Sequence, residues 1–319
     1  MDKLKKIAAV LAEKNKIALI CHINPDGDTV GSALALYAVL RKKGKSADIF
    51  CADAISEKLK YLPFSDRFNI NRERRYDAAV AVDCGDRGRM GVMAEVFDSA
   101  DIKICVDHHK SNGLTCDYTR VEPEKASTAE IVYALIKAFD ESALDKDSAT
   151  AVYAGILTDT GMFSYPATAA ETHRIAADLY GFGIDASDIA YNVLKKTAKK
   201  GFLLTHRALS RTRFFNGDRI GVVAFFLRDF EETGAGAGDT EGIVNSVQNI
   251  DGVYVAIALT EIDATHYRVS IRTKDPVDAS DIAGVFGGGG HRLAAGCRLD
   301  GDIEDIVDKL VKAAGDLLV

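Results

Sequence analysis

Residues 17–40, IALICHINPDGDTVGSALALYAVL, decide the fold of this chain. Residues 17–21 are a short apolar run, typical of a strand that is buried on both faces, and residues 29–40 carry apolar side chains at helical spacing. Between them, Pro25 cannot continue a strand and Gly27 tolerates any backbone angle, so the chain must turn sharply. The stretch predicts a buried strand, a tight loop and a helix.

The predicted loop carries one imidazole and two carboxylates, on His22, Asp26 and Asp28. In an open parallel sheet, ligands bind at the carboxyl ends of the strands, where this loop is expected. A single Asp near a helix start is usually only an N-cap. Three metal-ligating side chains within seven residues favour a metal site instead.

Two later apolar runs also end on acids. The runs AAVAVD and IKICVD end on Asp83 and Asp107, and the second is followed by His108 and His109. With helical segments between them, these strands indicate a parallel sheet that collects ligands along one edge. Paired histidines can also be core residues hydrogen-bonded to the backbone, and this alternative stays open.

A further acid, Asp159, follows the second of two predicted helices. The first helix, over residues 127–140, starts with the capping sequence Ser-Thr-x-Glu, and the second spans residues 147–158. The candidate site residues are then His22, Asp26, Asp28, Asp83, Asp107, His108, His109 and Asp159. Carboxylates and imidazoles without a thiolate favour Mn²⁺ or Mg²⁺ over structural zinc.

The second half of the sequence has a different pattern. We predict an α/β chain with an N-terminal parallel-sheet domain over residues 1–185, a basic linker helix over 186–211 and a smaller mixed α/β domain over 212–319. Asn216 and Gly217 give a strong hairpin signal. The further expected elements are a flexible stretch at 231–239, strands at 253–262 and 267–273, a helix at 278–286, a glycine loop at 287–291 and a last helix from 303.

The composition is that of an ordinary globular protein. With 319 residues, 47% of them hydrophobic, the chain can bury a full core. No apolar run approaches the ~20 residues that span a bilayer, and the N-terminus predicts an amphipathic helix, so we expect a cytoplasmic protein. The net charge of −7 argues against binding long nucleic acid. The six cysteines form no C-x-x-C pair and are expected to be reduced and structural.

Several motifs carry a family resemblance. HINPDGD, VDCGD, VDHH and TDTGMFSY, followed by VSIRTK and FGGGGHRLAAGC, resemble in order and spacing the motifs of the DHH family of phosphoesterases and its DHH-associated C-terminal domain. The resemblance covers nearly the whole chain and implies an active site in the cleft between the domains. Length and layout resemble the branch of cytoplasmic enzymes that degrade very short RNA and dephosphorylate 3′-phosphoadenosine 5′-phosphate (pAp).

The resemblance implies two Mn²⁺ ions, with Mg²⁺ or Co²⁺ as alternatives, that share the carboxylate of Asp83. It assigns the remaining ligands as His22 and Asp26 for one ion, and Asp28, His108 and Asp159 for the other. Asp107 is then expected to orient a neighbouring imidazole, and His109 to donate a proton to the leaving oxygen. Two such ions generate a hydroxide nucleophile and stabilise an in-line displacement at phosphorus.

Substrate contacts are expected from the second domain. The resemblance assigns the phosphate grip to Arg272 and to Gly288, Gly289, Gly290 and His291, with Asn245 and Arg89 as weaker candidates. Glycines let backbone N–H groups approach a phosphate closely, and Arg pairs with phosphate through two hydrogen bonds. Two alternatives stay open, namely that Arg272 is a surface strand residue and that the glycine cluster is only a flexible link.

The expected function is Mn²⁺-dependent hydrolysis of short oligoribonucleotides, pAp or both. The alternatives are a cyclic-dinucleotide or linear-dinucleotide phosphodiesterase, a RecJ-like single-strand exonuclease, a family II inorganic pyrophosphatase and a nucleotide-binding sensor without turnover. The glycine–histidine loop argues against the pyrophosphatase. Neither long duplex nucleic acid nor a membrane is expected as a partner, and a homodimer stays open.

Overall fold

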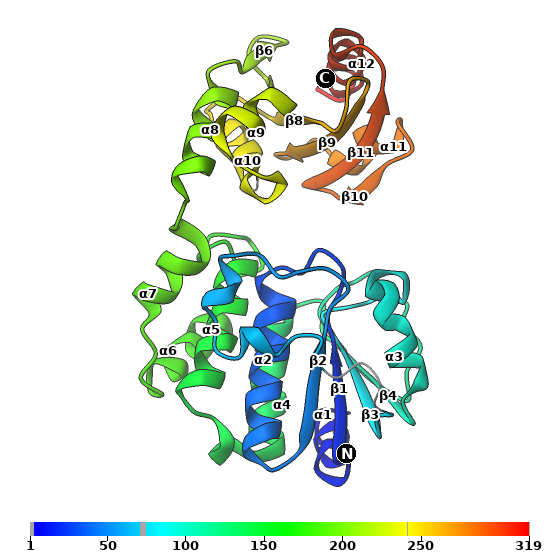
Figure 1. Cartoon of the computed structure of the whole chain (residues 1–319), viewed down its shortest axis with the longest axis vertical. Coiled ribbons are helices and arrows are strands. Elements are labelled where there is room, and N and C mark those ends of the chain that lie inside the picture. The colour runs from blue at the N-terminus through cyan, green and yellow to red at the C-terminus, as the bar shows by residue number, and fades with distance from the viewer. Residues whose placement is uncertain (1–2, 71–74, 241, 319) are drawn as a thin grey trace. The chain divides into compact units, whose positions relative to one another are not determined.

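The computed structural model describes residues 3–70, 75–240 and 242–318, and for His291 it describes the backbone alone. The chain divides into two compact units, Met1–Lys196 and Thr197–Val319 (Figure 1). In the described ranges no helix has both the length and the apolar character that crossing a membrane requires.

The helix expected over residues 186–211 is interrupted, and the boundary between the units falls at the interruption. In its place the structure has α7 (Ala186–Ala190), a π-helical turn (Tyr191–Lys195) and α8 (Lys199–Leu209). A continuous helix would place Lys195 beside Lys199 and Lys196 beside Lys200. Like charges four residues apart destabilise a helix, and this accounts for the break.

Unit 1 is built around a parallel sheet. Before α7 its helices and strands are, in chain order, α1 (Lys3–Glu13), β1 (Lys16–Ile20), α2 (Gly27–Lys42), β2 (Ser46–Phe50), β3 (Ala78–Val82), α3 (Ala94–Ser99), β4 (Ile102–Asp107), β5 (Tyr118–Val121), α4 (Thr128–Asp140), α5 (Lys146–Asp159) and α6 (Ala170–Tyr180). The strand order is β2-β1-β3-β4-β5, and every neighbouring pair is parallel. This confirms the predicted parallel-sheet fold, although β5 has no counterpart among the predicted strands.

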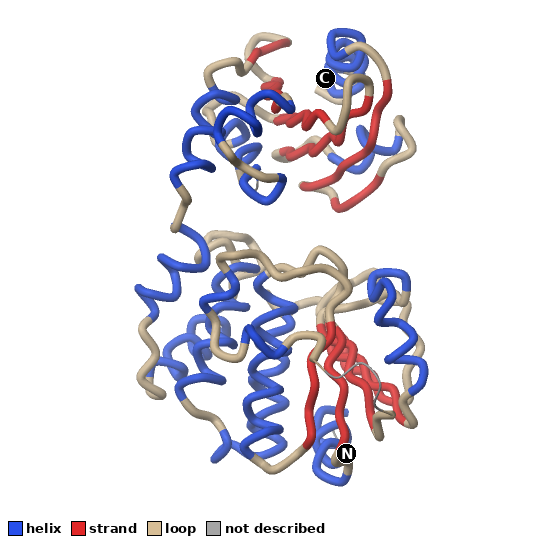
Figure 2. The backbone as a smooth tube through the Cα atoms, in the orientation of Figure 1, coloured by secondary structure: helices blue, strands red, loops and turns tan. Residues whose placement is uncertain are grey.

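Helices cover both faces of this sheet, as Figure 2 shows. Helices α1, α2, α4 and α5 contribute to the large apolar cluster on one face, and α3 packs on the other face against Phe50 and Tyr76. A strand covered on both faces must be apolar throughout, and the side chains of residues 17–20 in β1 are fully buried. The continuous apolar runs in the sequence therefore reflect two layers of helices.

The crossing of α2 and α5 depends on glycines. A Cβ atom on Gly31 of α2 would collide with the carbonyl oxygen of Ala151 and would lie 2.9 Å from the backbone nitrogen of Gly155, both in α5. A Cβ atom on Gly155 would lie 2.7 Å from the Cβ of Ala129 and 3.1 Å from Oδ1 of Asp28. The two helices therefore approach backbone to backbone, and this brings the start of α2 close to α5.

Unit 2 contains a mixed sheet. After α8 its helices and strands are β6 (Arg213–Phe215), β7 (Ile220–Phe225), α9 (Leu227–Thr233), α10 (Ile243–Gln248), β8 (Val255–Glu261), β9 (His266–Thr273), α11 (Ala279–Gly284), β10 (Gly289–His291), β11 (Ala294–Asp300) and α12 (Ile303–Gly315). The strand order is β10-β11-β9-β8-β7-β6, and only β7 and β8 pair in parallel. The predicted mixed α/β fold and the hairpin of β6 and β7 are confirmed.

Two segments of unit 2 differ from the expectations. The glycine loop expected at 287–291 ends as strand β10, in which Gly290 pairs with Ala295 of β11. Strand β11 is not predicted, because its small residues give little strand signal in the sequence. The stretch expected to be flexible at 231–239 contains the end of α9 and a 3₁₀ turn that begins at Ala237. Gly234, with a φ of 67°, ends α9 in the left-handed conformation that commonly terminates helices.

We predict that Gly31→Ala destabilises unit 1. The new methyl group would collide with the backbone of α5, and a helix backbone cannot move aside as a flexible side chain can. Overpacking of this kind lowers the free energy of unfolding by roughly 1–3 kcal/mol. The melting temperature, measured by circular dichroism, should fall by several degrees. Gly113→Ala is the matched control, because nothing lies within 4 Å of a Cβ atom there. Equal melting temperatures for the two variants would contradict the close helix crossing.

Candidate metal centre

Acidic and histidine side chains gather where the strands of the unit 1 sheet end. His22 follows β1, Asp83 follows β3, and Asp107 ends β4 just before His108 and His109; Asp26 and Asp28 start α2, and Asp159 ends α5. Distances of 4.0 Å or less between carboxylate oxygens and imidazole nitrogens link all eight residues. We call this set the acid–histidine cluster.

His22 is placed as a cation ligand would be. Its Nδ1 lies 2.7 Å from the carbonyl oxygen of Ile23, so this nitrogen carries the proton and donates it. Its Nε2 is buried and has no hydrogen-bond partner among the described residues. The Nε2 atom lies 3.6 Å from Oδ2 of Asp26 and 3.5 Å from Oδ2 of Asp83, which is too far for a good hydrogen bond.

The charge around His22 also suits a cation. Burial lowers the pKa of this imidazole, but the carboxylates of Asp26 and Asp83 more than compensate and raise it to about 10. A positive charge is therefore strongly favoured at this position. The three side chains can hold a metal ion, since one ligand atom from each lies within 4.8 Å of the others.

Asp83 occupies the centre of the cluster. Its φ of 57° is left-handed, a conformation that Asp and Asn adopt more readily than most residues. Oδ2 faces His22, while Oδ1 lies 3.7 Å from Nε2 of His108 and accepts a hydrogen bond of 2.8 Å from Oγ1 of Thr128. The two carboxylate oxygens therefore face two different imidazoles.

A second possible cation position lies between Asp28, His108 and Asp159. Nε2 of His108 is 3.3 Å from Oδ2 of Asp159 and 4.0 Å from Oδ2 of Asp28, and Nδ1 of His108 is 3.1 Å from the carbonyl oxygen of Lys125. Burial, and then the charge of Asp83, raises the pKa of Asp28 well above its usual range. Burial raises the pKa of Asp159 to about 7. Carboxylates this crowded attract a divalent cation.

Asp28 also has a structural contact that the sequence does not reveal. Its Oδ2 accepts a 2.7 Å hydrogen bond from the backbone N–H of Thr128, and its Oδ1 accepts a 2.9 Å bond from that of Ala129. Both donors belong to the first turn of α4, where N–H groups have no partner within the helix. The Ser-Thr-x-Glu capping signal locates this helix start, but it does not show which acid meets it.

The third part of the cluster joins Asp107 and His109. Oδ1 of Asp107 lies 2.8 Å from Nδ1 of His109, and its Oδ2 accepts a 2.6 Å hydrogen bond from Nδ2 of Asn112. The hydrogen bond to Asp107 raises the pKa of His109. For Asp107, burial acts to raise the pKa, but the hydrogen bonds from His109 and Asn112 outweigh burial and lower it. The contact with Asp107 therefore fixes the orientation of the His109 ring and favours its protonated form.

His109 also belongs to a third possible ligand set, with Asp83 and His108. Its Nδ1 lies 3.4 Å from Oδ1 of Asp83 but is already bonded to Asp107. Because Nδ1 is already bonded to Asp107, a metal ligand and a proton donor are competing roles for the other nitrogen of this side chain.

The remaining candidates are not members of the acid–histidine cluster. Arg89 is in a 3₁₀ segment, where its carbonyl oxygen accepts a 2.6 Å hydrogen bond from the N–H of Ile23, and its charge acts on His109. The other candidates belong to unit 2, where Asn245 is in α10, Arg272 in β9 and Gly288, Gly289 and Gly290 in or next to β10. The side chain of His291 lies outside the described part of the chain.

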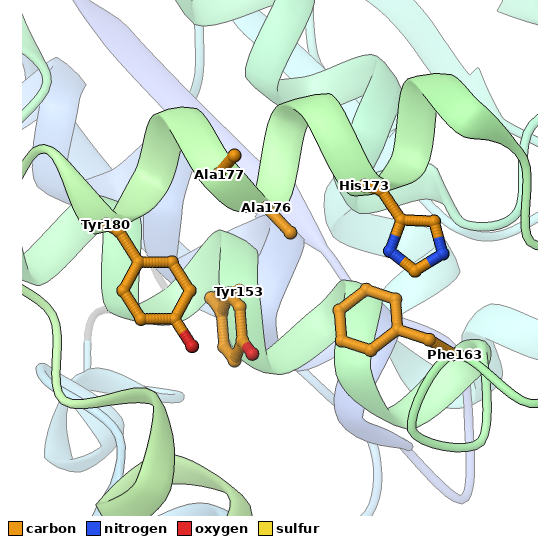
Figure 3. Close-up of a pocket in the computed structure, with 6 residues that line it drawn as sticks. All are labelled: Tyr153, Phe163, His173, Ala176, Ala177 and Tyr180. Carbon is orange, nitrogen blue, oxygen red and sulfur yellow. The ribbon is translucent and has the colours of Figure 1, made fainter.

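An aromatic cavity of about 410 Å³ lies elsewhere in unit 1 (Figure 3). Its walls are Tyr153 of α5, Phe163 and, from α6, His173 and Tyr180. The rings of Phe163 and His173 are stacked with their centroids 5.2 Å apart. None of the cluster residues lines this cavity, so His173 is a partner of Phe163 and not a member of the metal centre.

Both halves of the chain are similar in sequence to known protein families. The DHH family, N-terminal domain, matches residues 16–156, and the DHHA1 domain matches residues 219–319. The bifunctional oligoribonuclease and PAP phosphatase NrnA of Thermus thermophilus is 33% identical, with 99% of this chain and 95% of that protein covered. NrnA of Bacillus subtilis is 27% identical, with 89% of each covered. An exopolyphosphatase-related protein from Bacteroides fragilis superposes with a TM-score of 0.92 at 27% identity, with 98% of this chain and 96% of that chain covered.

We predict that Asp83→Asn weakens metal binding without unfolding unit 1. Asn tolerates the left-handed backbone and can still accept from Thr128, but it removes the charge between the two cation positions. Affinity for at least one Mn²⁺ should fall more than about a hundredfold, because even supporting contacts are worth ten- to a hundredfold. Calorimetric titration of metal-free protein measures this effect.

The matched control is Asp147→Asn, which neutralises an exposed acid in the first turn of α5. It should bind Mn²⁺ as the unmodified protein does. In EDTA the melting temperature of Asp83→Asn should stay close to that of the unmodified protein, because the charge that is removed repels Asp28 but attracts His22. Unaltered Mn²⁺ stoichiometry and affinity in this variant would show that Asp83 is not a ligand.

Proposed function

Since this chain belongs to the DHH family of phosphoesterases, we propose that it hydrolyses short oligoribonucleotides and pAp, the two activities that name its relatives. The observation that carries this proposal is the buried Nε2 of His22, which faces two carboxylates and has no hydrogen-bond partner in the described part of the chain. A purely structural histidine at this depth would be hydrogen-bonded at both nitrogens. A ligand to a cation keeps one lone pair available.

The donor set suits two Mn²⁺ ions, with Mg²⁺ or Co²⁺ as alternatives. His22 and Asp26 would hold one ion, Asp28, His108 and Asp159 the other, and Asp83 both. When bound, such a pair activates water and stabilises negative charge on the phosphoryl oxygens. Imidazole ligands favour Mn²⁺ over Mg²⁺, which prefers oxygen.

The proton for the leaving oxygen is assigned to His109. Its bond to Asp107 fixes the ring and raises its pKa, which favours the doubly protonated imidazole that a proton donor requires. Asn112 holds the other oxygen of Asp107 and thereby fixes the orientation of this carboxylate. Asp107 and Asn112 act as positioning residues, and His109 as the proton donor.

The phosphate grip is assigned to unit 2. Arg272 lies on β9, and Gly289 and Gly290 belong to β10, the edge strand of the sheet. An edge strand presents backbone N–H groups that no neighbouring strand uses, and glycine leaves them accessible to an anion. The edge strand thus offers the donors that the sequence led us to expect from a loop.

We predict that purified protein releases phosphate from pAp and nucleotides from RNA of two to five residues when Mn²⁺ is present. Mg²⁺ should support a lower rate, and EDTA should abolish both activities. Turnover should fall steeply on a 20-residue strand, because a chain of net charge −7 offers little to hold the distal phosphates. A labelled RNA ladder and a phosphate-release assay measure these rates.

Three results would contradict the proposed function and favour another one. Equal kcat/KM for a dinucleotide and a 20-residue strand would favour a RecJ-like exonuclease. Turnover confined to cyclic or linear dinucleotides would favour a dinucleotide phosphodiesterase. Tight nucleotide binding without any product would favour a sensor.

We predict that Arg272→Ala raises KM and leaves Mn²⁺ binding intact, because the side chain is assigned to the substrate phosphate. A hydrogen bond to a charged group contributes roughly 1.5–3 kcal/mol, so kcat/KM should fall about ten- to a hundredfold. Arg272→Lys keeps the charge but loses the two-pronged geometry, and it should recover part of the loss. Loss of Mn²⁺ from Arg272→Ala would contradict this role.

A further inference from the structure

One face of the unit 2 sheet is open to solvent over part of β9 and β11. Helices α8 and α10 pack on this face over β7 and β8, through an apolar cluster that includes Val223 and Ala258, and α10 also reaches the end of β9. On β9 the side chains of Arg268, Ser270 and Arg272 point to the same face and are exposed or half-buried, whereas the residues that alternate with them are buried. Solvent therefore reaches a row of polar side chains.

Two arginines lie directly opposite each other on this face. Arg268 of β9 is the register partner of Arg298 of β11. Like charges at directly opposed positions destabilise an antiparallel pair. Within the described ranges no carboxylate forms an ion pair with either one: Arg268 reaches only Oγ1 of Thr240, at 3.5 Å. Among the described residues, no carboxylate therefore neutralises the positive charge of this pair.

One acid lies near the two arginines, but its ion pair is with a histidine. Asp300 follows Arg298 on the same face of β11, and its Oδ1 lies 3.6 Å from Nε2 of His266. The stability of unit 2 gives no reason to place two arginines opposite each other. An anion bound from outside the chain would offset their repulsion and so account for the arrangement.

The surface between the two arginines is hollow. A cavity of about 510 Å³ is lined by both guanidinium-bearing residues together with Ser270, Phe286, Gly288 and Gly296. The glycines are required there, because a Cβ atom on Gly288 would collide with the carbonyl of Gly296, and one on Gly296 would lie 2.8 Å from that of Val269. The cavity thus combines two cations, one aromatic ring and a floor of small residues.

These features suit a nucleotide phosphate better than a carboxylate. Paired guanidinium groups match the geometry of phosphate oxygens, and a base attached to the phosphate can stack on Phe286. Arg268 lies four residues from Arg272 on the same face, which corresponds to about 13 Å along the strand. That separation exceeds one phosphate-to-phosphate step of an extended strand.

We propose that Arg268 and Arg298 bind a second phosphate of a short single-stranded RNA, beyond the phosphate assigned to Arg272. This inference rests on the proposed function for the identity of the ligand. Substrates of three or more nucleotides engage both positions, whereas a dinucleotide or pAp reaches only the first. The arginine pair is therefore a determinant of substrate length.

The test is direct binding in EDTA, where no hydrolysis interferes. Fluorescence anisotropy gives the Kd of a labelled pentanucleotide and a labelled dinucleotide for the full chain and for the double variant Arg268→Ala/Arg298→Ala. The pentanucleotide Kd should rise about tenfold in the double variant, and the dinucleotide Kd less than twofold. The slope of log Kd against log salt concentration for the pentanucleotide should fall by about 0.7, as loss of one phosphate contact requires.

Arg228→Ala in α9 is the matched control, since it removes an exposed arginine that forms no ion pair among the described residues. It should change neither Kd. The melting temperature of the double variant should be unchanged or higher, because an opposed like-charge pair is gone. An unchanged or higher melting temperature shows that weaker RNA binding by the double variant is not caused by unfolding.

Other outcomes overturn the inference. Equal losses for both RNA lengths would mean that the pair belongs to the first phosphate position. An unchanged pentanucleotide Kd, or no pentanucleotide binding by the unmodified protein, would remove the second position altogether. If the unmodified protein hydrolyses none of the substrates but binds the pentanucleotide through the pair, the proposed function fails and the second-phosphate site stands.

Discussion

Negative charge concentrated at one edge of the first sheet is the constraint on which unit 1 depends. Burial and mutual repulsion raise the pKa values of Asp28 and Asp159, so this charge opposes folding. The protein offsets part of it with donors, because Asp28 accepts two N–H groups from the start of α4, where the helix dipole also favours an anion. Cations would supply the rest, so the need for charge balance and the capacity for phosphoester chemistry have one physical origin.

The helices position this charge through close backbone contact. Gly31 and Gly155 let α2 and α5 cross so tightly that Asp28 and Asp159, 131 positions apart in the sequence, both come within 4.0 Å of one imidazole on His108. The left-handed backbone at Asp83 serves the same end, since it presents two carboxylate oxygens to two different histidines. The geometry of the acid–histidine cluster thus depends on two glycines that carry no functional side chain and on the backbone conformation of Asp83.

The sequence predicts most of the first sheet and all eight cluster residues, because a buried strand is apolar throughout and an acid at its end stands out. It does not predict Thr128 or Asn112, whose contacts depend on which helix or loop faces which carboxylate. It also misses β10 and β11, where glycine and alanine give little strand signal, and their pairing is set by close backbone approach at Gly288. Local pattern reveals what lies in the core, whereas tertiary packing decides what faces the site.

The charge of the cluster also determines when a phosphate can approach it. Two like unit charges 4 Å apart repel by about 4 kcal/mol at the effective dielectric constant of a protein surface. In the cluster, carboxylate and imidazole ligand atoms lie within 4.8 Å of one another in groups of three. A phosphate therefore meets a barrier at the metal-free centre and an attraction once divalent cations are bound. The arginines of unit 2 do not depend on metal for their charge. Charge alone thus makes phosphate binding at the cluster depend on cations, whereas the strand binding that we propose for unit 2 does not depend on them.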